Sequence, residues 1–152
     1  MRVDLADAEA TGRLGAGIAP LLEPGDALLL YGDLGAGKST LARALIRALT
    51  RLDEDVPSPT FTLVQLYEAT PPLAHFDLYR LSAPEEVDEI GLDEALADGA
   101  ALIEWPQRLG DDIARICGPN RLTIHLEEQG GGRVATVSGV GSWEGRLDHV
   151  RL

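Results

Sequence analysis

The sequence has only one cysteine, Cys117, and only one lysine, Lys38, among its 152 residues. A single cysteine excludes an internal disulfide and is typical of proteins from a reducing compartment. No apolar run approaches the roughly 20 residues of a membrane-spanning helix. The first residues include early acids and lack the apolar stretch of a signal peptide. These absences predict a cytoplasmic protein that does not associate with a membrane.

Basic side chains are also scarce, because 13 Lys and Arg face 25 Asp and Glu, for a formal net charge of −12. Proteins that bind nucleic acid need a basic face against the phosphates. The charge therefore argues against a chain that binds nucleic acid alone, although action through a basic partner stays open. The length predicts a single domain over residues 1–152.

The stretch Gly32–Thr40, Gly-Asp-Leu-Gly-Ala-Gly-Lys-Ser-Thr, matches the phosphate-binding pattern G-x-x-x-x-G-K-[ST] at every fixed position. An apolar run, Ala27–Tyr31, precedes it, and a segment with leucines four apart, Leu41–Leu49, follows it. Strand, glycine-rich loop and helix form the expected context, because loop N–H groups and a helix N-terminus together attract phosphate. Lys38 is expected to contact the outer phosphates, and the Ser39 hydroxyl is expected to ligate Mg²⁺.

The lone lysine strengthens this interpretation. All the other basic residues are arginine. Lysine is thus used only at the position where the loop needs a slim, flexible ammonium group. The chain has no Asn-Lys-x-Asp motif for reading guanine, which favours ATP over GTP.

The remaining sequence alternates helical and strand patterns, which predicts an α/β fold. We expect a first helix from an Asp7 N-cap to about Leu22 and a later helix opened by the capping box Ser82–Glu85. Further strands are expected at 61–67 and 73–77, as a hairpin, at 100–104, and at 121–127 paired with 133–139. The sum is a P-loop NTPase-type sandwich with a mixed sheet, parallel around the nucleotide loop and antiparallel at its edges.

A nucleotide-bound Mg²⁺ needs the loop hydroxyl and a carboxylate at the end of a neighbouring strand. Ala100–Glu104 is apolar up to its last residue, as a strand beside the loop strand should be, so we expect Ser39 and Glu104 to hold the metal. Asp77 ends another strand and is the second candidate carboxylate, for orienting water or reaching the metal through water. The predicted catalytic residues are Lys38, Asp77 and Glu104, although each carboxylate could simply end a strand.

Other residues leave two interpretations open. Ser58 and Thr60 lie between and after two prolines in a segment that is either a switch or a rigid connector. Arg80 either neutralises phosphate or lies on the surface, and Trp105 either reports nucleotide state or is a core aromatic. The acidic segment 85–98 is either a solvated face or a docking surface for a basic partner.

His75 and Tyr79 flank Asp77 and are expected to pack and orient neighbouring groups rather than to perform chemistry.

Motifs in register carry a family resemblance: Gly32–Thr40, Ser58-Pro-Thr-Phe61, His75-Phe-Asp-Leu-Tyr-Arg80 and Glu104-Trp-Pro-Gln107. Together they resemble the TsaE (YjeE) family of small bacterial ATPases. The resemblance covers nearly the whole chain and weakens after Gly118. Ser39 stands where many members have threonine, and either hydroxyl ligates Mg²⁺.

The resemblance implies a Mg²⁺-dependent ATPase, weak alone, that drives or resets a TsaD-like carbamoyltransferase and its TsaB-like companion. That system makes threonylcarbamoyladenosine in tRNA, so the chain would act on tRNA only through the complex. By motif position it implies roles in hydrolysis or coupling for Thr40, Asp77 and Trp105. It also implies a nucleotide-binding set around the loop and on the first helix: Thr11, Leu34, Gly35, Ala36, Gly37, Lys38, Ser39 and Thr40.

Two other classes of function remain as alternatives. A P-loop small-molecule kinase needs an acceptor pocket and an arginine-bearing lid, for which Arg108 and Arg115 are poor candidates beside a short acidic stretch. A nucleotide-dependent assembly module would use ATP only to shape a binding surface and would not hydrolyse it.

Overall fold

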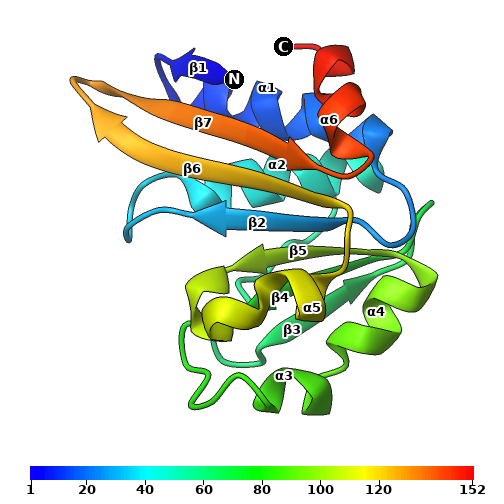
Figure 1. Ribbon diagram of the computed structural model, residues 1–152. Coiled ribbons are helices and arrows are strands. Elements are labelled where there is room, and N and C mark those ends of the chain that lie inside the picture. The colour runs from blue at the N-terminus through cyan, green and yellow to red at the C-terminus, as the bar shows by residue number, and fades with distance from the viewer.

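The structure is a computed structural model of residues 1–152, and its central feature is a seven-stranded sheet. The strands lie in the order β1-β7-β6-β2-β5-β4-β3 (Figure 1). Their bounds are β1 Arg2–Leu5, β2 Ala27–Tyr31, β3 Val64–Tyr67, β4 Leu73–Asp77, β5 Ala100–Glu104, β6 Arg121–Gln129 and β7 Gly132–Val140.

The strands β6, β2, β5 and β4 are parallel to one another and form the middle of the sheet. Outside them, β3, β7 and β1 each run antiparallel to their neighbours. This arrangement confirms the predicted α/β fold and the predicted mixture of parallel and antiparallel pairs. β2 lies between the parallel strands β5 and β6. The loop that follows the carboxyl end of β2 is therefore at the edge of the sheet where α/β proteins bind ligands.

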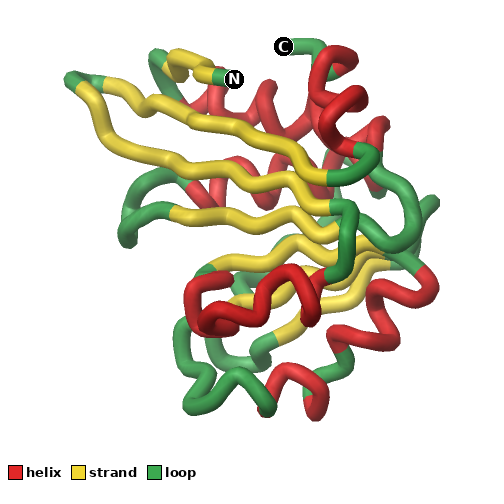
Figure 2. Tube along the Cα trace, viewed as in Figure 1, coloured by secondary structure: helices red, strands yellow, loops and turns green.

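Helices cover both faces of the sheet (Figures 1 and 2). One face carries α1 and α2, and the other carries α3, α4 and α5. The helices are α1 Ala8–Ile18, α2 Lys38–Leu49, α3 Glu86–Glu89, α4 Leu92–Asp98, α5 Ile113–Cys117 and α6 Trp143–Arg146, with 3₁₀ turns at Ala19–Leu21, Pro106–Asp112 and Leu147–His149. No helix is both long enough and apolar enough to cross a membrane.

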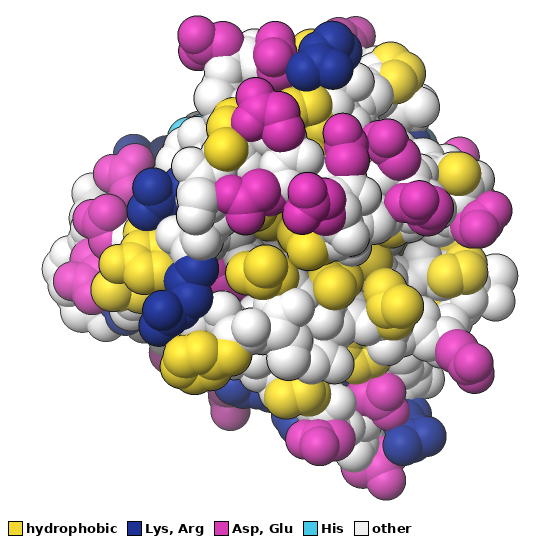
Figure 3. Space-filling view, turned by 90° about the horizontal axis from the view of Figure 1, so that it is seen from below, with side chains coloured by type: hydrophobic (Ala, Val, Ile, Leu, Met, Phe, Trp, Pro, Cys, Tyr) yellow, Lys and Arg dark blue, Asp and Glu magenta, His cyan; other side chains and the backbone are white.

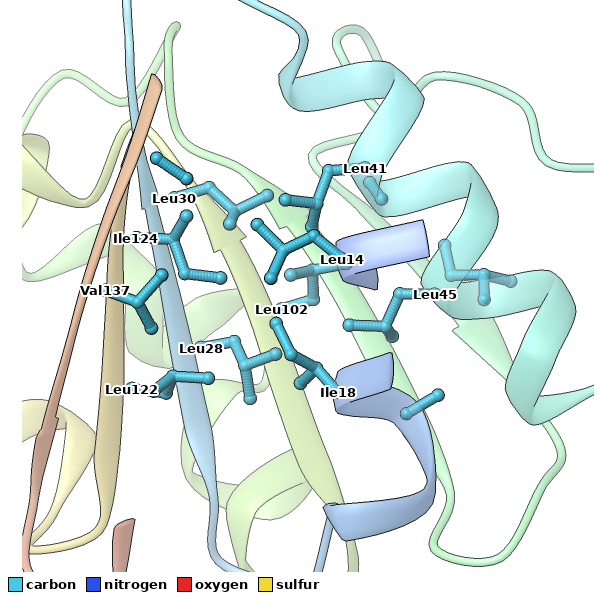
Figure 4. Close-up of a cluster of buried hydrophobic side chains, with 14 of the residues drawn as sticks. Leu14, Ile18, Leu28, Leu30, Leu41, Leu45, Leu102, Leu122, Ile124 and Val137 are labelled. Atoms are coloured by element: carbon cyan, nitrogen blue, oxygen red, sulfur yellow. The ribbon is translucent and has the colours of Figure 1, made fainter. Parts of the chain in front are cut away.

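Alternation along the strands divides the apolar side chains between two cores. In β2, Leu28 and Leu30 join the core beneath α1 and α2, whereas Leu29 joins the opposite one. Figure 4 shows the first core, where side chains of two helices meet those of four strands: Leu14, Ile18, Leu28, Leu30, Leu41, Leu45, Leu102, Leu122, Ile124 and Val137. In β5 the same period of two directs Glu104, like Leu102, toward the α2 face.

The ends of α1 and of the chain are fixed by specific polar contacts. Asp7 caps α1 as predicted, because its Oδ1 accepts a hydrogen bond of 2.8 Å from the Ala10 N–H. Near the C-terminus, Arg146 donates to both Asp26 carboxylate oxygens, at 2.6 and 2.9 Å. Asp26 is 1% exposed, and breaking such a buried pair costs about 3–5 kcal/mol. The pair therefore holds α6 against the turn that leads into β2.

Three local features differ from the sequence prediction. Strand β1 was not predicted, because only Leu5 is buried in it and its pairing partner β7 lies far away in the chain. The strand expected from Phe61 begins only at Val64, since Leu63 has a φ of 69° and interrupts the extended backbone.

The predicted capping box at Ser82–Glu85 was wrong. Instead, the Glu86 carboxylate accepts a hydrogen bond from the Ala83 N–H, and α3 ends at Glu89. Gly91 then takes a φ of 88°, and a separate helix, α4, begins at Leu92. A left-handed glycine is a common helix terminator, so the acidic segment is folded as two short helices rather than one.

Candidate functional site

The predicted phosphate-binding stretch forms the loop between β2 and α2. Gly35 and Gly37 have φ angles of 82° and 106°, in the left-handed region that favours glycine. Such conformations let successive N–H groups turn into one concavity. Because α2 begins at Lys38 directly after Gly37, the positive end of the helix faces the same concavity. The strand, loop and helix predicted around the motif are all present.

Arg133, on β7, supports this loop from outside and was not anticipated from the sequence. Its Nε donates to the Ala36 carbonyl at 3.1 Å, and its Nη2 donates to the Gly35 carbonyl at 3.0 Å. By binding two successive carbonyls on the outer side, the guanidinium favours a loop whose N–H groups face inward. Its partners are 97 and 98 positions away in the chain, so no local sequence signal could have identified it.

Lys38 is buried, at 5% exposure, and its Nζ has no hydrogen-bond partner. The Nζ lies 3.7 Å from the centroid of the Trp105 ring, in cation–π contact. Burial lowers the pKa of Lys38, while the carboxylates of Glu104 and Asp77 act to raise it. A buried ammonium without hydrogen-bond partners is costly, so this position fits an anion such as a phosphate oxygen.

The two candidate carboxylates are brought together by strand register. Asp77 and Glu104 are paired residues at the ends of the parallel strands β4 and β5, and each is 6% exposed. Asp77 accepts hydrogen bonds from the Thr60 hydroxyl at 3.1 Å and from the Tyr79 N–H at 3.0 Å. Paired residues of neighbouring strands point to the same face of a sheet, so both carboxylates face the loop and α2.

His75 lies directly behind Glu104. Its Nε2 and the Glu104 Oε2 are 2.6 Å apart in a buried hydrogen bond. The contact restrains one carboxylate oxygen and leaves the second free of any protein partner. His75 thus orients Glu104, as expected from the sequence, where His75 was predicted to orient a neighbouring group rather than to perform chemistry.

Trp105 has an unusual backbone conformation, with φ 58° and ψ 47°. This region is uncommon for a bulky residue and marks a site that its surroundings hold in place. The indole lies against the Tyr79 ring, with centroids 4.9 Å apart, and beneath Lys38. Trp105 therefore lines the site and is placed to sense any movement of the Lys38 ammonium.

These residues surround one small cleft of about 160 Å³ at the carboxyl ends of the parallel strands. Ser58 and Thr60 belong to it, with their hydroxyl oxygens 2.7 Å apart and Thr60 bonded to Asp77. The full lining comprises Leu34, Gly35, Gly37, Lys38, Ser39, Ser58, Thr60, Asp77, Glu104 and Trp105. Segments that are distant in the sequence thus meet at the phosphate-binding loop.

Other predicted residues lie outside this lining. Thr11 is buried next to the loop, because a Cβ placed on Gly37 would lie 3.6 Å from the Thr11 Cγ2. Ala36 and Thr40 do not line the cleft. Arg80 is exposed and lies over the Phe61 ring, 4.9 Å from its centroid. The structure therefore does not place the Arg80 guanidinium at the cleft.

The residues present fit a nucleotide-bound Mg²⁺. No cluster of three or more His, Cys, Asp or Glu side chains is arranged to hold a metal by itself. Mg²⁺ on a nucleotide needs fewer protein ligands, because phosphate oxygens and water supply the rest. Ser39, Asp77 and Glu104 line the same cleft and offer oxygen ligands.

The single cysteine is poorly suited to thiol chemistry. Cys117 is fully buried, and burial raises its pKa to about 11. The thiolate, which is the reactive form, is therefore disfavoured at neutral pH.

An α/β sheet with a glycine-rich loop between its central strand and a helix, and with two carboxylates on adjacent strand ends, is the arrangement of a P-loop NTPase-type fold. The comparisons with known proteins narrow this class. A family model described as "Threonylcarbamoyl adenosine biosynthesis protein TsaE" matches residues 5–135. The chain belongs to the TsaE family, which takes part in tRNA threonylcarbamoyladenosine biosynthesis.

Individual relatives agree with this assignment. The chain is similar to the tRNA threonylcarbamoyladenosine biosynthesis protein TsaE of Rickettsia conorii, with 40% identity over 120 residues, covering 78% of this chain and 66% of the relative. The protein of that name from Streptomyces coelicolor is 35% identical over 137 residues, covering 84% and 89%. The crystal structure of Bacillus subtilis YdiB superposes with a TM-score of 0.75 and 30% identity, covering 97% of this chain and 90% of that chain.

Proposed function

We propose that this chain binds ATP with Mg²⁺ and hydrolyses it to drive or reset a TsaD-like carbamoyltransferase and its TsaB-like companion. The observation that carries the proposal is the meeting of Lys38, Ser39, Asp77 and Glu104 in one cleft beside the glycine-rich loop. The reaction that the partners would carry out is the threonylcarbamoyladenosine modification of tRNA, and we propose that it takes place in the cytoplasm.

Phosphate binding is supported by the buried ammonium of Lys38, which lacks a hydrogen-bond partner within the chain. In the proposed complex, Lys38 leaves the Trp105 ring and binds the outer phosphates, and loop N–H groups bind the remaining oxygens. The exchange of a cation–π contact for a charged hydrogen bond is favourable. The indole then loses its cation, which gives the site a built-in optical reporter.

Ser39 and Glu104 would hold Mg²⁺, which when bound offsets charge on the phosphates. Glu104 retains one oxygen without a protein partner for this purpose, because His75 binds the other. Asp77 is held by Thr60 and by the Tyr79 N–H, so its carboxylate is fixed in place to orient an attacking water. Lys38, Asp77 and Glu104 are thus the proposed catalytic residues.

The family assignment supports the choice of pathway, and the acidity of the chain supports action through partners. A formal net charge of −12 leaves the chain poorly suited to hold tRNA by itself. The partner pair would contact the tRNA, while this chain supplies the nucleotide cycle.

The test is ATP hydrolysis by the purified chain, with and without the TsaD–TsaB pair, together with a reconstituted tRNA modification assay. We expect slow hydrolysis alone and a changed rate with the pair. Lys38→Ala and Glu104→Gln should lose modification activity at least tenfold. Full activity of either variant would overturn the site assignment, and Arg115→Ala, at an exposed ion pair with Asp112, is the matched control.

The kinase alternative lacks support from the position of the arginines. Arg115 pairs with Asp112 on the surface, and Arg108 lies over the Tyr79 ring, 5.6 Å from its centroid. Neither lines the cleft. Transfer of phosphate to a small acceptor in a metabolite screen would nevertheless establish that activity.

Single-turnover kinetics distinguish the assembly-module alternative from the proposed ATPase. If ATP serves only to shape a binding surface, bound ATP persists unchanged in a single-turnover experiment, both with and without the pair. Conversion to ADP within the lifetime of the complex supports the proposed ATPase.

A further inference from the structure

A second and larger hollow, of about 810 Å³, lies away from the nucleotide cleft, between the edge strand β3 and helices α3 and α4. Its floor is apolar and includes Val64, Leu66, Ala74, Ile90 and Ala95. Leu66 is 76% exposed, which is unusual for a leucine on a strand beside a core. We call this hollow the β3 groove.

The strand that borders the groove has an open edge. β3 is the last strand of the sheet and pairs only with β4. Asp77 N–H donates to the Leu63 carbonyl, and hydrogen-bonded pairs alternate along an antiparallel ladder. The backbone groups of Val64 and Leu66 therefore point away from β4, where an added strand could pair with them.

The rim of the groove carries one sign of charge. Five exposed carboxylates border it, and none of them forms an ion pair within the chain: Glu68, Asp88, Glu89, Glu94 and Asp98. No lysine or arginine lines it. Figure 3 shows hydrophobic side chains gathered across the lower face of the molecule, with acidic side chains beside them.

The geometry points to a docking site for an extended protein segment that alternates apolar residues with Lys or Arg and adds to the sheet beside β3. We propose that this segment belongs to the partner pair, so the inference rests on the proposed function. Main-chain bonds to the edge would supply affinity, apolar side chains would cover Leu66, and basic side chains would meet the rim. A second copy of this chain does not fit, because two acidic rims would face each other.

The groove is connected to the nucleotide cleft through the chain itself. β3 continues directly from the segment that carries Thr60, whose hydroxyl binds Asp77. Leu63, immediately before β3, accepts the Asp77 N–H bond. A strand docked on β3 would therefore restrain the segment that positions one of the proposed catalytic carboxylates.

The test measures binding of the purified TsaD–TsaB pair to the full chain. Leu66→Lys should weaken binding at least tenfold and leave basal ATP hydrolysis unchanged. Leu52→Lys is the matched control, since Leu52 is 87% exposed and outside the groove, and it should bind like the wild type. Glu89→Lys combined with Glu94→Lys should also weaken binding at least tenfold and flatten its salt dependence, unlike Asp111→Lys combined with Asp148→Lys.

Hydrogen exchange tests the added strand itself. Binding of the pair should slow exchange of the Val64 and Leu66 amides, which now face outward. Equal affinity of Leu66→Lys and Leu52→Lys, or unslowed exchange at both amides, would overturn the groove while leaving the proposed function intact. Failure of the wild-type chain to bind the pair at all would overturn both.

Discussion

Lys38, the proposed phosphate-binding side chain, is held in an unfavourable state. Its ammonium is buried, has no hydrogen-bond partner and lies over the face of Trp105, while the nearby carboxylates of Glu104 and Asp77 favour its charged form. The pKa of Lys38 is lowered by burial, which shows that the fold disfavours the charged form. At the residue scale, the proposed binding of an anion would relieve this unfavourable state.

We predict that Lys38→Met raises the stability of the nucleotide-free chain while abolishing ATP binding. The expected gain is about 1–3 kcal/mol, because a buried polar group without a partner is replaced by an apolar one of similar shape. Urea unfolding at neutral pH measures the first effect, and titration with ATP measures the second. A less stable variant would show that the Trp105 contact outweighs the cost of burial.

Arg133 is the second residue whose part emerges only in the folded chain. We predict that Arg133→Ala weakens ATP binding about tenfold or more, because it removes charged hydrogen bonds to the Gly35 and Ala36 carbonyls. Trp105 fluorescence during ATP titration provides the measurement. The control is Arg2→Ala, which removes an exposed hydrogen bond to Gln129 and should bind ATP like the wild type. An unchanged ATP affinity of Arg133→Ala would show that Arg133 does not stabilise the loop for binding.

At the scale of elements, α1 packs closely against α2, the helix that follows the phosphate-binding loop. The two helices approach closely at Gly15, where an added Cβ would lie 2.5 Å from the Leu41 carbonyl oxygen. At Gly12, one turn earlier, the nearest atom to an added Cβ is the Ala44 Cβ at 3.5 Å, an ordinary contact. Packing against α2 thus requires a glycine at position 15 but not at position 12.

We predict opposite effects for alanine at these two positions. Gly15→Ala should destabilise the chain by about 1–3 kcal/mol, because the two backbones must separate. Gly12→Ala should stabilise it by about 0.5–1 kcal/mol, since alanine is the better helix former. Thermal unfolding of both variants is the measurement, and equal effects would contradict the close approach of α1 to α2.

At the scale of the whole molecule, negative charge dominates. The net charge is −12, and unpaired carboxylates gather beside the β3 groove. The nucleotide cleft is the place where this field is locally opposed, by Lys38, by the loop N–H groups and by the N-terminus of α2.

We predict that the isolated chain does not bind tRNA measurably at physiological salt. Binding to tRNA phosphates requires a basic face. Without one, the negative charge of the chain repels the tRNA. Fluorescence anisotropy of labelled tRNA should stay unchanged on addition of the chain and should rise when the TsaD–TsaB pair is present. Tight, salt-sensitive binding to the chain alone would contradict the proposed division of labour.

Much of this protein follows from the sequence because the relevant signals are local. The glycine-rich motif, its flanking strand and helix, and the apolar run ending in Glu104 depend on residues close together in the chain. Hydrophobic period and turn chemistry act over a few residues, so they predicted the α/β fold and the mixed sheet. They failed where a single conformation interrupts a pattern, as at Leu63 and Gly91.

Only the tertiary structure decided which distant residues meet. Strand register places Asp77 beside Glu104, and the pairing of β6 with β7 places Arg133 at the loop. The packing of α6 near the C-terminus places Arg146 against Asp26. The sequence left the acidic segment 85–98 as either a solvated face or a docking surface, and the tertiary structure places part of it beside an open strand edge, on which the docking proposal rests. These outcomes depend on long-range packing, because burial and hydrogen-bond partners are set by the whole sheet rather than by neighbours in the chain.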